Sequence, residues 1–163
     1  LRSALPEAGY ATLSVQMPVL AATARSEDYP FTFVEARERL RVAEAWLRKR
    51  GHGAVALVAH SLGARMSNEF LVATPQPRIA AWVSIGMSGE FIRPQRFDLP
   101  ILDLYGERDL PPVLAAAAGR AQILRKLPAS SQVQVNGADH FFSDREQELV
   151  QWVRRFLDRV IAR

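Results

Sequence analysis

The sequence predicts an α/β domain in which helices flank a mainly parallel sheet. Three observations indicate this class. Segments rich in β-forming residues alternate along the 163 residues with segments whose apolar side chains recur at helical spacing. The segment 54–59 is apolar on both faces, as a strand buried between two helical layers requires. No internal repeat or low-complexity tract interrupts the alternation.

The expected elements follow in order along the chain. Residues 1–9 are typical of the end of a helix and a turn, and residues 18–31 of a loop. Strands are predicted at 11–16, 54–59, 79–85, 101–105 and 132–135. Helices are predicted at about 36–47, 63–73 and 111–127, with a last one after residue 143. Capping-box spacing at Thr32–Glu35 and Ser143–Glu146 predicts the start of the first and last of these helices.

Composition excludes several classes of protein. Apolar residues make up 48% of the chain and charged residues 23%, which is typical of a globular protein and not of a disordered one. The net charge of +4 comes from scattered arginines, so no nucleic-acid partner is expected. Apolar runs are too short to span a bilayer, and we expect a soluble protein of the cytoplasm or periplasm. Without cysteine, and with three separated histidines, no metal site is expected.

Functional side chains are expected just beyond the carboxyl ends of the strands, because ligands bind at that edge of a parallel sheet. The strand at 54–59 runs into Ala-His-Ser-Leu-Gly at 59–63, the nucleophile-elbow pattern G-x-S-x-G with alanine at its first position. Small residues let the strand and the helix approach closely, and the sharp turn exposes the serine hydroxyl. Ser61 is therefore the candidate nucleophile. His60 and Ser88 are candidate substrate-binding residues.

A serine hydroxyl needs a base to remove its proton, and His140 is the candidate. His140 follows the last predicted strand, whereas His52 lies at the opposite end of the sheet. The side chain of His60 is expected to leave the elbow in a direction away from the serine hydroxyl, so that it packs or hydrogen-bonds beside the site.

A carboxylate should orient the imidazole of the base and stabilise its protonated form. Asp109 is favoured because it follows the strand at 101–105 by four residues, and Glu90 is its rival. Asp103 lies inside a strand and is predicted to be a paired, structural carboxylate. Asp139 is adjacent to the candidate base in sequence and is predicted to point away from it.

From Tyr10 to its end the sequence resembles the α/β-hydrolase superfamily, and most of all a bacterial family of α/β-hydrolase-like proteins without an assigned substrate. The resemblance rests on three segments, at 59–63, at 104–109 (Leu-Tyr-Gly-Glu-Arg-Asp) and at 137–142 (Gly-Ala-Asp-His-Phe-Phe). It implies a serine hydrolase without a cofactor, which cleaves a small carboxylic ester or thioester through a Ser-Asp-His triad and an acyl-enzyme. It also implies that the Leu62 N–H donates to the oxyanion.

The same resemblance implies strands before residue 1. In this superfamily two or three strands precede the one predicted at 11–16, and the loop after one of them supplies a second oxyanion donor. We therefore expect residues 1–163 to form a single α/β-hydrolase-like domain that lacks its first strands and is incomplete at the N-terminus. Such a segment should be poorly stable or inactive by itself. The alternative function is a non-catalytic α/β-hydrolase-like module for binding or assembly.

Overall fold

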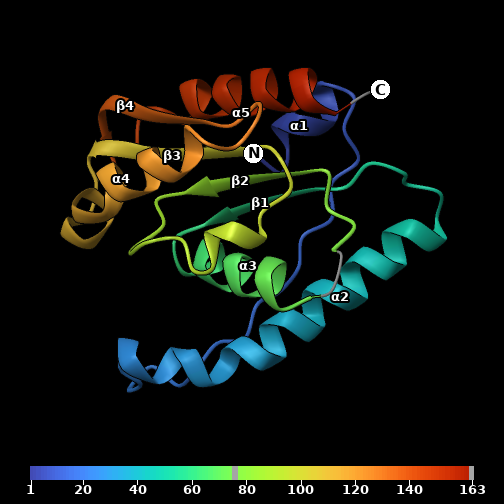
Figure 1. The fold of residues 1–163 in the computed structure, drawn as a ribbon, viewed down its shortest axis with the longest axis horizontal. Coiled ribbons are helices and arrows are strands. Elements are labelled where there is room, and N and C mark those ends of the chain that lie inside the picture. The colour runs from blue at the N-terminus through green and yellow to red at the C-terminus, as the bar shows by residue number, and fades with distance from the viewer. Residues whose placement is uncertain (75–76, 162–163) are drawn as a thin grey trace.

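A computed structural model describes residues 1–74 and 77–161 of the chain. In this part of the chain, the strands form one parallel sheet in the order β1-β2-β3-β4. Each strand therefore lies beside the next one in sequence, as Figure 1 shows. The bounds are β1 (Ala56–His60), β2 (Ala81–Ile85), β3 (Ile101–Arg108) and β4 (Ser131–Asp139).

Helices cover both faces of the sheet (Figure 1). The α-helices are α1 (Ala4–Glu7), α2 (Phe33–Lys49), α3 (Leu62–Ala73), α4 (Pro111–Leu124) and α5 (Glu146–Val160). Two 3₁₀ helices, η1 (Ser26–Thr32) and η2 (Pro94–Arg96), lie in connections. Among the described residues, no helix has both the length and the hydropathy needed to cross a membrane.

Successive side chains of β2 point to opposite faces of the sheet, so the core has two parts. Val83 and Ile85 face α1 and α5 and pack with side chains such as Phe156. Trp82 points to the other face, where it packs with Phe70 of α3 and with residues of α2 and α4. All five residues of β2 are buried, which explains why this strand is an unbroken apolar run apart from one serine.

The strand predicted at 11–16 is absent, and this expectation was wrong. These residues have no regular structure, and among the described strands β1 pairs with β2 alone. The segment lies beside α2 instead, where Arg39 donates a hydrogen bond of 2.5 Å to the Gln16 carbonyl. β-forming side chains do not make a strand when no neighbouring strand accepts and donates its backbone hydrogen bonds.

The helix start predicted from Thr32 is confirmed, since α2 begins at the next residue, but neither predicted capping box forms. Thr32 precedes α2, but its hydroxyl donates to the Tyr29 carbonyl at 2.7 Å and does not cap the helix. The last helix begins at Glu146 after Arg145, whereas the backbone N–H of Ser143 donates to the Asp139 carboxylate. In both places the preceding turn uses the polar groups that the capping pattern assigned to the helix.

Candidate active site

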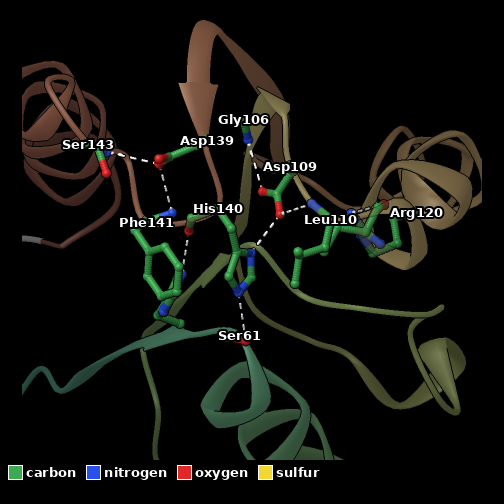
Figure 2. Close-up of polar contacts among 11 residues, drawn as sticks. Ser61, Gly106, Asp109, Leu110, Arg120, Asp139, His140, Phe141 and Ser143 are labelled. Carbon is green, nitrogen blue, oxygen red and sulfur yellow. Dashed lines mark hydrogen bonds and ion pairs between the residues drawn. The ribbon is translucent and has the colours of Figure 1, made fainter.

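Four residues meet at one edge of the sheet because each of them is the first residue after a strand. Ser61 follows β1, Gly86 follows β2, Asp109 follows β3 and His140 follows β4. The strands are parallel and adjacent, so these four positions lie side by side at their carboxyl ends. Figure 2 shows the serine, aspartate and histidine side chains directed toward one another.

The elbow holds Ser61 in a backbone conformation that only a constrained turn maintains. Its φ is 55° and its ψ is −124°, values that are rare for a residue with a side chain. Its N–H donates to the Ile85 carbonyl at 2.7 Å, and its own carbonyl accepts from Ala64 at 3.0 Å. The next residue, Leu62, begins α3, and in the described structure its N–H has no acceptor, so the N–H is free to bind an anion.

A chain of hydrogen bonds joins the three side chains. His140 Nδ1 lies 2.6 Å from Asp109 Oδ1, and His140 Nε2 lies 2.9 Å from Ser61 Oγ. The Asp109 carboxylate also accepts from the N–H groups of Gly106 and Leu110, at 3.1 and 2.8 Å. A carboxylate held this way only accepts, so Nδ1 of the imidazole carries the proton. The lone pair on Nε2 then faces the serine hydroxyl.

His60 contacts both the backbone and the ring of His140. Its Nε2–H donates to the backbone carbonyl of His140 at 2.7 Å, and the two rings lie 4.7 Å apart between centroids. Partial burial of the ring lowers the pKa of His60, and the hydrogen bond to the His140 carbonyl only partly opposes this shift. The lowered pKa favours the neutral form of His60, which adds no positive charge beside the His140 imidazole. Its role in substrate binding stays a prediction, as does that of Ser88 in the loop after β2.

The other carboxylates lie elsewhere. Glu90 is exposed and its carboxylate lies against Gly119 of α4. Asp103 is fully buried in an ion pair of 2.8 Å with Arg120, as expected of a structural carboxylate. Asp139 points away from the imidazole and accepts from backbone N–H groups that follow it, as Figure 2 shows. Among residues 1–74 and 77–161, no cluster of three His, Asp or Glu side chains could hold a metal ion.

Solved structures share this architecture. The protein TT1662 of Thermus thermophilus superposes with a TM-score of 0.68 at 20% identity, over 91% of this chain and 73% of that one. The esterase domain of a Rhodothermus marinus protein superposes with a TM-score of 0.57 at 19% identity, over 73% of this chain and 68% of that one. MGS-MChE2, an α/β-hydrolase enzyme from a lagoon-sediment metagenome, superposes with a TM-score of 0.57 at 14% identity. The match covers 76% of this chain and 70% of that one. The fold is that of the α/β-hydrolases. No protein-family model matches the chain, and no curated protein matches its sequence.

Within this α/β-hydrolase fold, Gly86 is a residue whose importance the sequence reasoning missed. A Cβ at this position would lie 3.1 Å from both Cε1 and Nδ1 of His140 and 3.5 Å from Asp109 Oδ2. Its φ of +56° also disfavours any larger residue. The signal that could have found it is its position, since it directly follows a predicted strand.

We expect Gly86→Ala to lower kcat by about 10²-fold, because the added methyl displaces the imidazole and a small misplacement of a reacting group is costly. Gly89→Ala is the matched control. Gly89 has a similar positive φ of +78°, but no atom lies within 4 Å of its Cβ position. Steady-state ester hydrolysis by both variants tests this. Equal losses in the two variants would mean that backbone strain, and not contact with His140, causes the effect.

Proposed function

We propose that this protein is a serine hydrolase that cleaves carboxylic esters or thioesters through an acyl-enzyme. The observation that carries the proposal is the continuous hydrogen-bond chain from Asp109 through His140 to Ser61. Nucleophile, base and orienting carboxylate in mutual contact are the arrangement that acyl transfer to a hydroxyl requires. The esterase and hydrolase names among the structural neighbours agree with this proposal.

The first half of the reaction forms the acyl-enzyme. Ser61 Oγ attacks the carbonyl carbon while its proton passes to His140 Nε2, and the carbonyl oxygen becomes an oxyanion. In this scheme the N–H of Leu62, which has no acceptor in the described structure, donates to that oxyanion. When the tetrahedral intermediate collapses, the bond to the alcohol or thiol breaks. The leaving group takes the proton from His140 Nε2, which returns the base to its neutral form.

The second half releases the acid. Water enters beside His140, which removes one proton as the water oxygen attacks the acyl carbon. The tetrahedral intermediate then expels Ser61, whose oxygen recovers the proton from Nε2. Asp109 keeps Nδ1 protonated and stabilises the imidazolium in both halves. The reaction consumes only ester and water and needs no cofactor.

Labelling with a fluorophosphonate tests the proposal. An activated serine reacts with the probe, so we expect the intact protein to label at Ser61 and the Ser61→Ala variant to remain unlabelled. Ester hydrolysis by the variant should fall by about 10⁶-fold. Ser14→Ala, at an exposed position beside α2, should label and turn over like the parent protein. A parent protein that neither labels nor hydrolyses esters would support the non-catalytic binding module instead.

A further inference from the structure

Phe141 is an apolar side chain that the fold leaves in solvent. Its exposed fraction is 75%, although it directly follows the base His140 in sequence. The next residue, Phe142, has an exposed fraction of only 1% and packs in the core. The turn therefore buries one of its two phenylalanine side chains and leaves the other in solvent. An exposed aromatic side chain offers apolar surface that an apolar ligand group can cover, with a gain in free energy on burial.

The backbone around Phe141 is held in place. Asp139 Oδ1 accepts from the N–H groups of Phe141 and Ser143, at 3.0 and 2.9 Å. These bonds lower the pKa of Asp139, which keeps the carboxylate charged and the turn closed. Phe142 anchors the same turn in the core. The fixed conformation of this turn therefore keeps the Phe141 ring in solvent.

The ring lies beside the base. Its centroid is 5.3 Å from that of His140, with the two planes at 74°, and 6.2 Å from that of His60. Figure 2 shows Phe141 on one side of the His140 imidazole and Leu110 on the other. Leu110 is also partly in solvent, with an exposed fraction of 46%. In this view the two apolar side chains thus lie to either side of the imidazole.

In the proposed reaction, the alcohol portion of the substrate lies next to the His140 imidazole. His140 must protonate the departing oxygen, so the alcohol portion of an ester has to lie within hydrogen-bond reach of its Nε2. The oxyanion and the acyl carbon lie instead toward Leu62 and Ser61. A side chain packed against the imidazole is therefore beside the leaving group. We propose that Phe141 determines specificity by binding the apolar alcohol portion of the substrate, an inference that rests on the proposed hydrolase function.

Two ester series, assayed with the intact protein by release of acid, test this inference. One series varies the alcohol from ethyl acetate to hexyl acetate, and the other varies the acyl group from ethyl acetate to ethyl hexanoate. Because the alcohol leaves during acylation, kcat/KM reports its binding. We expect Phe141→Ala to lower the kcat/KM ratio of hexyl to ethyl acetate about tenfold. The ratio in the acyl series should not change.

Trp46→Ala is the matched control. Trp46 is an aromatic residue with an exposed fraction of 43%, near the end of α2 that leads to the start of β1 and so to the opposite edge of the sheet. This variant should leave both ratios unchanged. Equal losses in the two series of Phe141→Ala, or no loss in either, would overturn the inference. A parent protein that hydrolyses none of the esters would instead contradict the proposed function and remove the basis of this inference.

Discussion

Replacing Asp109 with asparagine is expected to lower kcat by about 10⁴-fold while the fold is kept. The Asp109 side chain is fully buried, and each carboxylate oxygen accepts from a backbone N–H, that of Gly106 or that of Leu110. In either orientation the asparagine amide turns an N–H group toward one of these donors. The negative charge that stabilises protonated His140 is also lost. In one orientation the amide donates to Nδ1, and the imidazole proton then lies on Nε2. A protonated Nε2 cannot accept the proton of the serine.

Steady-state hydrolysis of a neutral ester, together with circular dichroism to check the fold, measures this effect. The control is Glu90→Gln, which makes the same change from carboxylate to amide at the rival acid. The exposed Glu90 has no hydrogen bond to His140 in the described structure, so kcat should stay close to that of the parent. A large loss at Glu90 and a small one at Asp109 would transfer the orienting role to Glu90.

Replacing Arg120 with methionine is expected to lower the free energy of unfolding by about 3–5 kcal/mol, the usual cost of removing one partner of a buried ion pair. Arg120 and Asp103 are both fully buried, and their ion pair measures 2.8 Å. Burial raises the pKa of Asp103, and the guanidinium opposes this effect. Without Arg120 the carboxylate keeps an unpaired charge or takes up a proton, and the carbonyls of Gly89 and Val113 lose their donors.

Urea denaturation of the single variant and of the double variant Arg120→Met with Asp103→Leu separates the causes. The double variant should regain a large part of the loss, because it leaves no buried charge behind. Arg41→Met is the matched control, since Arg41 pairs with Glu38 on the exposed surface of α2. Its unfolding midpoint should change little. A double variant no more stable than the single one would show that the lost backbone contacts dominate.

How far the site could be predicted depended on where its residues stand in the sequence. Ser61, Asp109 and His140 each follow a strand that the apolar pattern indicates, and the elbow motif distinguishes the serine. Their contact is a finding of the structure, and their catalytic roles stay predictions. The position of Gly86 after a predicted strand places it near the site, but its need to be glycine arises from its distance to His140. Distances between separate strands leave no pattern in a single sequence. Phe141 directly follows His140, and the sequence does not show that its ring is exposed while that of the next phenylalanine is buried.

The sequence by itself determined the class of the fold and the order of its elements. Apolar periodicity is a local property, and it distinguishes a buried strand such as β2 from an amphipathic helix such as α5 before any contact forms. The assignment of residues 1–163 to one domain stays a prediction of this kind. Only the tertiary structure decided the rest, because a strand needs a neighbouring strand and a cap needs a side chain directed at the first turn of its helix. Residues 11–16 have no neighbouring strand, and the Thr32 hydroxyl bonds to the Tyr29 carbonyl instead of capping α2.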